Sequence, residues 1–228
     1  MNKKLKWITI LGTLILIFFL TACSENQEET ADTPAASEDC WANRYVALIT
    51  SGKAREASDY NSMQAELDQI RRECGATHVY ALSPAKDGAP SLDIETVETE
   101  NFLLTVDGSQ DPDDWATEYE WEVPFTEAWN GEPAAARSAW NNDKNGKEQC
   151  WSAFAPVYDN NGYPVCILGI DYPCSEVIAD YPEWNRDDSS WNGFEDNIEG
   201  DVPDEIQAMM DQVTSLAEKY AKQLSYVR

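Results

Sequence analysis

The spacing of apolar residues after position 40 predicts three helices. Apolar side chains recur every three or four residues from Trp41 to Ser51 and from Asn61 to Cys74, and Gly75 is a stop signal for the second helix. A third helix is predicted from Pro203 to the end of the chain, because acids precede bases along it, as the helix dipole favours. Its apolar positions form one face, which we expect to pack on its own domain rather than on a second copy or a partner helix: Ile206, Met209, Val213, Leu216, Tyr220, Leu224 and Val227.

Between the second and third helices the pattern changes to one typical of strands. The clearest runs are Thr77 to Leu82 and Asn101 to Val106, with a weaker alternating stretch around Leu92 and Ile94. Helices that precede a group of short strands predict the α+β class, with an antiparallel sheet.

The most informative pair of strands lies near the centre of the chain. Apolar runs at Cys150 to Tyr158 and Tyr163 to Asp171 flank the tetrapeptide Asp159 to Gly162. An Asn and Gly cluster between two apolar runs is a strong hairpin signal, so we expect these runs to pair as neighbouring antiparallel strands.

A long segment, Asp107 to Gln149, separates the predicted strands from this hairpin. It is rich in Trp, Glu, Asp and Pro. Long connections inside compact domains usually have a function, so we expect this one to cover a binding site. The alternative is a surface insert that its tryptophans hold in place.

The first residues carry a separate pattern, that of an export signal. Three lysines precede an uncharged stretch from Trp7 to Leu20, which at 14 residues is shorter than the roughly 20 that cross a bilayer. The tetrapeptide Leu20-Thr21-Ala22-Cys23 follows directly. It resembles the lipobox of bacterial lipoproteins, which implies cleavage after residue 22 and lipidation of Cys23. An ordinary signal peptide or a membrane-anchoring helix is the alternative.

The residues after Cys23 fit a lipid-anchored protein. Residues 23–38 are polar and contain no aromatic side chain, so we interpret them as a flexible tether. Two or three acyl tails would anchor the chain stably. We therefore expect the protein at the cell membrane, on the extracytoplasmic side.

Charge narrows the set of partners. The chain has a net charge of -26, and removal of residues 1–22 deletes three lysines and no acids, which gives -29. Such an acidic protein is not expected to bind nucleic acid or to lie flat on anionic lipid. The roughly 190 residues after the tether fit one domain with an extension better than two domains.

Cysteine content adds one structural expectation. Five cysteines remain besides Cys23, which leaves an odd thiol, and their spacing contains no metal-binding motif. Because Cys40 opens the first predicted helix and Cys74 closes the second, an antiparallel helix pair would join them in a disulfide. The full pairing among Cys40, Cys74, Cys150, Cys166 and Cys174 is left open.

The hairpin also carries a family resemblance. Trp151, Ser152, Ala153, Phe154, Ala155 and Pro156, then the turn at Asp159 to Gly162, then Gly169, Ile170 and Asp171 resemble the closing motif of extracytoplasmic PAS-like sensor domains of the Cache type. Earlier pieces agree in order, including Trp129 to Pro133. The resemblance implies a Cache-like domain at residues 39–182, followed by an acidic segment and a helix at 183–228.

That resemblance implies a binding pocket under the long segment. Cache domains bind amino acids, amines, carboxylates and similar solutes. By position, Asp171 looks like the carboxylate that pairs with a ligand ammonium group, and Trp151 like an aromatic wall. Tyr80, Trp121 and Trp129 are weaker candidates. The alternatives are that Asp171 caps a strand and that the tryptophans belong to the core.

Two function hypotheses follow. The first is a lipid-anchored small-molecule binding or sensing domain that acts through a membrane-protein partner. Cache domains usually lie between two membrane helices, whereas here the longest uncharged apolar run after Cys23 is Val165 to Ile170, and no output module follows. The second is a ligand-free protein-interaction module on the cell surface.

Enzymatic and metal chemistry are less well supported. No hydrolase, P-loop or zinc-protease motif occurs, and the only histidine, His78, is expected to be structural, so we do not expect an enzyme or a cofactor. Asp188 to Glu199 matches the register of a calcium loop. The segment is so acidic that a chance match is expected, and we assign no metal site.

Overall fold

The computed structural model describes residues 40–52, 59–93, 102–119, 122–191 and 202–226, all within one compact unit. The lipobox, Cys23 and the tether lie outside the described residues. In order, the helices are α1 (Trp41–Ser51), α2 (Tyr60–Cys74), α3 (Val123–Trp129), α4 (Ser175–Asp180), the short 3-10 helix η2 (Pro182–Trp184) and α5 (Asp204–Leu224). The three predicted helices are confirmed. Gly52 and Gly75 end α1 and α2 in the left-handed conformation, which costs glycine little.

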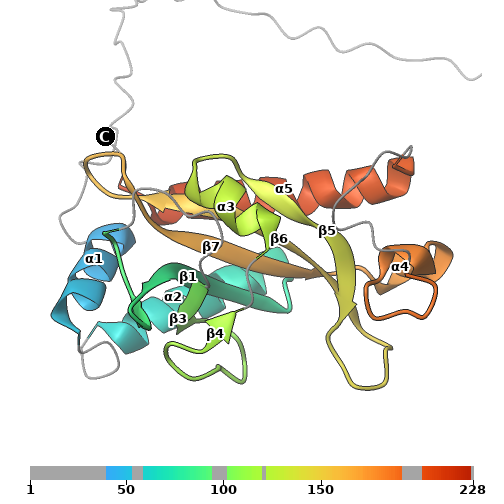
Figure 1. Cartoon of the computed structure of the whole chain (residues 1–228), viewed down its shortest axis with the longest axis horizontal. Coiled ribbons are helices and arrows are strands. Elements are labelled where there is room, and N and C mark those ends of the chain that lie inside the picture. Colours follow the sequence, from blue (N-terminus) through green and yellow to red (C-terminus); the bar gives the residue numbers. More distant parts are fainter. Residues whose placement is uncertain (1–39, 53–58, 94–101, 120–121, 192–201, 227–228) are drawn as a thin grey trace, which may run out of the picture. The chain divides into compact units, whose positions relative to one another are not determined.

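The strands form a single antiparallel sheet. They are β1 (His78–Lys86), β2 (Ala89–Pro90), β3 (Phe102–Asp107), β4 (Glu118–Tyr119), β5 (Ala134–Asn141), β6 (Gln149–Tyr158) and β7 (Pro164–Pro173). Their order is β4-β3-β1-β7-β6-β5, with β2 paired to β1 (Figure 1). The α+β class is confirmed. Of the weaker stretch, Leu92 belongs to no strand and Ile94 lies outside the described residues.

The predicted hairpin is the centre of the sheet. β6 and β7 pair along almost their whole length, from Cys150 opposite Pro173 to Tyr158 opposite Pro164. In the turn, the Asp159 carboxylate accepts hydrogen bonds from the backbone N–H groups of Asn161 and Tyr163. These bonds fix the register, which decides the face on which each side chain lies.

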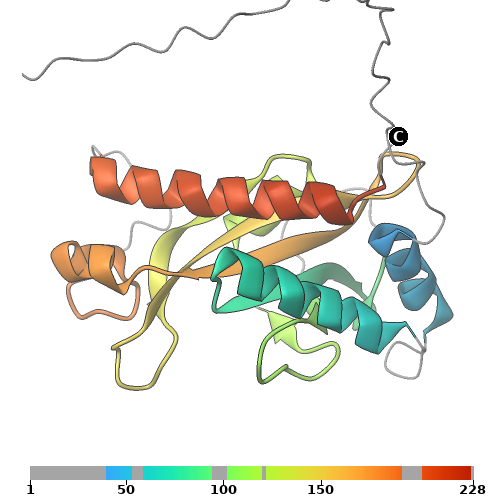
Figure 2. The same cartoon turned by 180° about the vertical axis from the view of Figure 1, so that it is seen from behind.

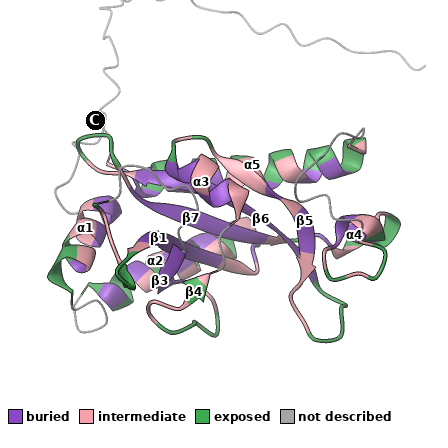
Figure 3. Cartoon of the chain, viewed as in Figure 1, coloured by how far each residue is buried: buried purple, intermediate pink, exposed green. Residues whose placement is uncertain are grey.

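The two faces of the sheet are covered differently. Helices α2 and α5 lie over one face, and the short helix α3 lies over the other (Figures 1 and 2). The first face holds the larger apolar core, to which β6 contributes Trp151 and Ala153 and α5 contributes Val213. As predicted, α5 packs on its own domain. Figure 3 shows the central strands buried between these layers.

The opposite face is apolar at one end and polar at the other. Aromatic residues of β3, α3 and β6 pack edge to face, with 4.6 Å between the ring centres of Phe125 and Phe154 and 5.1 Å between those of Phe102 and Phe125. Beyond this cluster the face opens into the cavity described below.

The long segment from Asp107 to Gln149, for which the sequence predicts no helix or strand, contains regular structure. It contains β4, α3 and β5, and β5 pairs with β6 as the last strand of the sheet. The reason is compositional: Ala134 to Ala136 have no strong strand propensity, and α3 is only 7 residues long, so neither stands out in the pattern.

The predicted Cys40–Cys74 disulfide is also wrong, because all five cysteines of the described region are free thiols. The Arg44 guanidinium of α1 binds Ser62 and Glu66, in the first half of α2. With a rise of about 1.5 Å per residue, Cys74 lies roughly 12 Å farther along α2 than Glu66. Figure 2 shows α1 beside only that first half.

Candidate ligand-binding cavity

A cavity of about 540 Å³ opens on the α3 side of the sheet. This volume lies within the range of about 300–1,000 Å³ that small-molecule sites occupy. The walls come from the central strands, the segment after β3, the start of α3 and the end of β5. The lining residues are His78, Tyr80, Asp107, Ser109, Asp111, Asp113, Tyr119, Glu122, Phe125, Trp140, Asn142, Ser152, Phe154, Asp171 and Arg186.

Asp171 is one of two buried acids in the lining, with 4% of its surface exposed; the other is Asp107, also 4% exposed. On β7, Asp171 lies opposite His78 of β1 and opposite Ser152 of β6, so all three side chains point to one face. Tyr80 shares that face because it lies two residues after His78. The sheet register thus gathers four polar side chains from three strands.

Protein groups surround the Asp171 carboxylate on most sides. Its Oδ1 accepts hydrogen bonds from the Tyr80 hydroxyl at 3.1 Å and the Ser152 hydroxyl at 2.7 Å. Its Oδ2 lies 3.3 Å from Nδ1 of His78, an ion-pair contact rather than a well-aligned hydrogen bond. A carboxylate has about four acceptor positions, so Oδ2 retains capacity for a further donor.

Trp140 closes one side of this group. Its indole N–H donates to the Ser152 hydroxyl at 2.9 Å, and its ring stacks on the His78 imidazole with 6.1 Å between ring centres. Ser152 thereby receives one hydrogen bond and donates another to Asp171. The chain of contacts fixes the direction in which the carboxylate points.

These contacts change the protonation of the polar groups. Burial lowers the pKa of His78, but the nearby Asp171 and Asp107 carboxylates outweigh burial and raise it above its ordinary value. Burial, followed by the negative charge of Asp171, raises the pKa values of Tyr80 and Tyr119 well above 10. Both phenols therefore remain neutral hydrogen-bond donors, and the imidazole carries a proton over a wider pH range.

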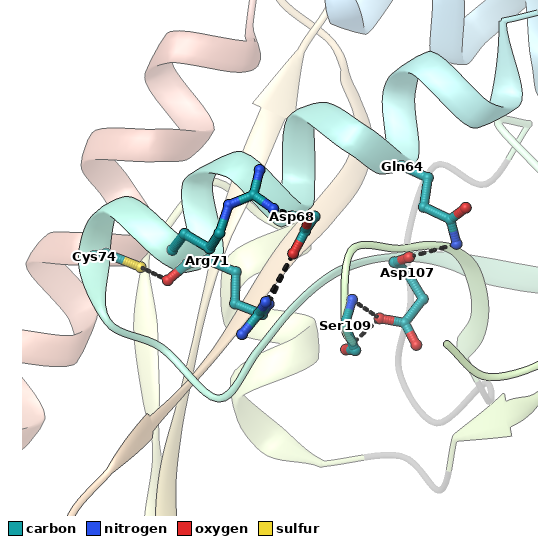
Figure 4. A network of polar contacts seen from close by, with 7 residues as sticks. Gln64, Asp68, Arg71, Cys74, Asp107 and Ser109 are labelled. Carbon is teal, nitrogen blue, oxygen red and sulfur yellow. Dashed lines mark hydrogen bonds and ion pairs between the residues drawn. The ribbon is translucent and has the colours of Figure 1, made fainter. Parts of the chain in front are cut away.

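The segment after β3 is folded around Asp107, whose carboxylate accepts hydrogen bonds from the N–H and hydroxyl of Ser109 and from the N–H of Asp113. Gln64 of α2 donates to the Asp107 carbonyl at 2.9 Å, as Figure 4 shows. Gly108 lies so close to the α2 backbone that a Cβ atom would come within 2.5 Å of Leu67 and Asp68. This wall of the cavity is therefore held against α2.

The remaining cation of the lining is already engaged. Arg186, in the segment after η2, forms an ion pair of 2.8 Å with Glu122 at the start of α3. Five carboxylates line the cavity, at Asp107, Asp111, Asp113, Glu122 and Asp171, whereas Arg186 and His78 are its basic groups. The lining is consequently acidic, with aromatic walls.

The structure separates the residues that the sequence singled out. Asp171 and Tyr80 meet in the cavity. Trp151 lies on the opposite face of β6, fully buried, and donates its indole N–H to the Ala136 carbonyl at 2.7 Å. Trp129 packs on Phe102 in the aromatic cluster and does not line the cavity. Trp121 lies outside the described residues.

The position of Trp151 has a simple physical cause. Side chains alternate along a strand, so Ser152 and Trp151 cannot point to the same face of β6. Ser152, Trp140 and Arg186 are cavity residues that the sequence did not indicate, and His78, expected to be structural, also lines the cavity. The register of the predicted hairpin places Ser152 opposite Asp171, whereas His78 requires the pairing of β1 with β7 as well. No sequence signal indicates Trp140 or Arg186, because both depend on how distant segments fold together.

The described residues were also compared with the requirements of a metal site and of a membrane-spanning helix. Within the described ranges no group of three or more His, Cys, Asp or Glu side chains is placed to hold a metal ion. The calcium-loop match at Asp188 to Glu199 lies mostly outside these ranges. None of the described helices is both long and apolar enough to cross a membrane.

Comparisons with known proteins find only structures of low similarity. No protein-family model and no curated protein matches the chain. The periplasmic domain of RsbU from Chlamydia trachomatis superposes with a TM-score of 0.35 at 10% identity, over 60% of this chain and 46% of that one. This chain therefore spans less than half of that structure.

Two further structures are similar to a comparable degree. The ligand-binding domain of the Campylobacter jejuni chemoreceptor Tlp3, in complex with L-valine, gives a TM-score of 0.31 at 12% identity, over 61% of this chain and 59% of that one. NreA from Staphylococcus aureus, mutated in its nitrate-binding site, gives a TM-score of 0.33 at 9% identity. The match covers 55% of this chain and 97% of that one. At such scores the function has to be argued from the cavity itself.

Proposed function

We propose that this chain is a lipid-anchored, extracytoplasmic domain of the PAS-like sensor type that binds a small organic solute through an ammonium group. The observation that carries the proposal is the buried Asp171 carboxylate at a cavity of about 540 Å³. Both hydroxyl donors bond to Oδ1, so Oδ2, which has only the His78 contact, keeps an acceptor position that a ligand ammonium group can fill. Cys23 is the proposed lipid attachment site, and a membrane protein the proposed recipient of the signal.

The cavity walls support a cationic ligand. Tyr80, Tyr119 and Trp140 line the same cavity as Asp171. Aromatic faces attract ammonium groups, by about 0.5–2 kcal/mol each. The two phenols also stay protonated, so they add no competing charge.

We propose binding rather than catalysis. The Ser152 hydroxyl donates to Asp171, and the imidazole of His78, the only histidine of the chain, also contacts Asp171. A nucleophilic serine would instead need its hydroxyl paired with the imidazole, which would accept the proton. The arrangement supports a carboxylate held in one orientation for a ligand.

The test is calorimetric titration of the full chain, in mild detergent at low salt, with n-butylamine and with butanoate. We expect saturable binding of n-butylamine and none of butanoate. Asp171→Asn keeps the shape of the side chain but removes its charge, and it is expected to weaken amine binding at least about 10-fold. Asp180→Asn, an exposed acid at the end of α4, is the matched control. Equal binding to both variants would refute the proposal.

A further inference from the structure

The charges of the cavity are unevenly placed, and this restricts the ligand further than a single ammonium group does. Asp171 is buried beside the central strands, whereas Asp111 and Asp113 lie exposed on the segment after β3. All three line the same cavity. A solute that reaches from the sheet towards solvent therefore meets negative charge at both of its ends.

A solute with a carboxylate finds no available cation in this lining. Binding to the Arg186 guanidinium would have to compete with Glu122, which lies 2.8 Å away, and would leave that acid unpaired in an acidic cavity. The His78 imidazole is engaged with Asp171 at 3.3 Å. An amino acid would thus bring one favourable and one unfavourable charge.

We infer that the cavity takes a linear organic dication of the diamine class, with one ammonium against Asp171 and the other beside Asp111 and Asp113. The inference rests on the proposed function and names the ligand class for the same site. The methylene chain between the two ammonium groups lies along the aromatic walls, where Tyr119 and Phe125 exclude water from it.

The two ends contribute unequally. The ammonium at Asp171 is largely desolvated, so its charge pair is strong. The ammonium at the exposed acids is screened by water and salt, which limits its contribution to a few-fold in affinity. The ammonium at Asp171 therefore provides most of the affinity, and the ammonium beside Asp111 and Asp113 determines the selectivity among amines.

The experiment uses three ligands with four carbons each, titrated calorimetrically into the full chain: 1,4-diaminobutane, n-butylamine and 4-aminobutanoate. They differ only at the fourth carbon, which bears a second ammonium group in the diamine, is a methyl group in n-butylamine and is a carboxylate in 4-aminobutanoate. We expect 1,4-diaminobutane to bind about 3- to 10-fold more tightly than n-butylamine, and 4-aminobutanoate at least about 10-fold more weakly than the diamine. About 0.5 M salt should remove most of the diamine preference.

The double variant Asp111→Asn/Asp113→Asn separates local charge from the overall acidity of the chain. It should bind the diamine and n-butylamine almost equally, whereas the exposed control Asp180→Asn should keep the preference. If n-butylamine binds but the diamine binds no more tightly, or if 4-aminobutanoate binds as well as the diamine, the dication inference is overturned and the proposed amine site stands. If no amine binds, both fail.

Discussion

The two faces of one strand, β6, differ in their surroundings, because one is packed in the apolar core and the other lies at the acidic cavity. Trp151 lies on the face of the sheet that α2 and α5 cover, fully buried in the apolar core, with 6.5 Å between its ring centre and that of Trp184. Its neighbour Ser152 points the other way, to Asp171 and Trp140 in an acidic cavity. The pair teaches that the largest aromatic side chain of the hairpin belongs to the core, and that the small polar one beside it belongs to the cavity.

The largest effect is expected on the core face. Trp151→Ala should lower the free energy of unfolding by about 3–5 kcal/mol, because it empties a packed site and removes the hydrogen bond to Ala136. Urea denaturation followed by circular dichroism measures the loss. Trp140→Ala is the comparison on the cavity face: Trp140 is half-buried, so a loss below about 2 kcal/mol is expected. Equal losses would contradict the division between the faces.

A smaller effect is expected where the strands approach the cavity. A Cβ atom on Gly169 would lie 2.4 Å from the Tyr80 ring, so Gly169→Ala should push that ring into the cavity. We expect a loss of about 1–3 kcal/mol in stability and weaker binding of n-butylamine. Gly162→Ala, in the hairpin turn with no atom near its Cβ position, is the control: strain at its positive φ lowers stability without changing affinity. Unchanged affinity in Gly169→Ala would place Tyr80 outside the site.

The sequence predicts those features of the fold and the cavity that depend on residues close together in the chain. Local patterns predict α1, α2, α5 and the β6–β7 hairpin, because periodicity and turn residues act over a few positions. The resemblance at the hairpin indicated Asp171, and the structure brings it to the cavity with Tyr80. The segment from Asp107 to Gln149 was expected to cover the site, but Arg186 and Trp140 were missed, because they reach the cavity only through the complete fold, and no pattern of spacing records that.

The hydrogen bonds of Ser152 offer a finer test of the same comparison. Ser152→Ala removes the donor to Asp171 and the acceptor of Trp140, so about 1 kcal/mol of stability and a few-fold in amine affinity should be lost. Ser83→Ala is matched, since this buried serine bonds to the Ser91 carbonyl away from the cavity. It should lose similar stability and no affinity. The same loss of affinity in both variants would show that the effect is indirect.

The smallest expected effect is a dependence of stability on pH. The pKa of His78 is raised in the folded chain, so the imidazolium stabilises the fold fully below its unfolded pKa of about 6.5, and this stabilisation disappears as pH rises through the folded pKa. Urea unfolding measured from pH 5.5 to 8.5 should show this decline. His78→Gln should remove it, since the chain has no other histidine. A decline that persists in His78→Gln would assign it to other groups.

The central claim, that an ammonium group binds beside Asp171, is tested most directly by nuclear magnetic resonance of this single imidazole. Its Nδ1 lies 3.3 Å from the Asp171 carboxylate, so a ligand cation placed there must disfavour the imidazolium. Addition of n-butylamine near neutral pH is predicted to shift the His78 ring resonances towards those of the neutral form, and not to do so in Asp171→Asn. Resonances that stay in place at amine concentrations that saturate the calorimetric titration would contradict the account.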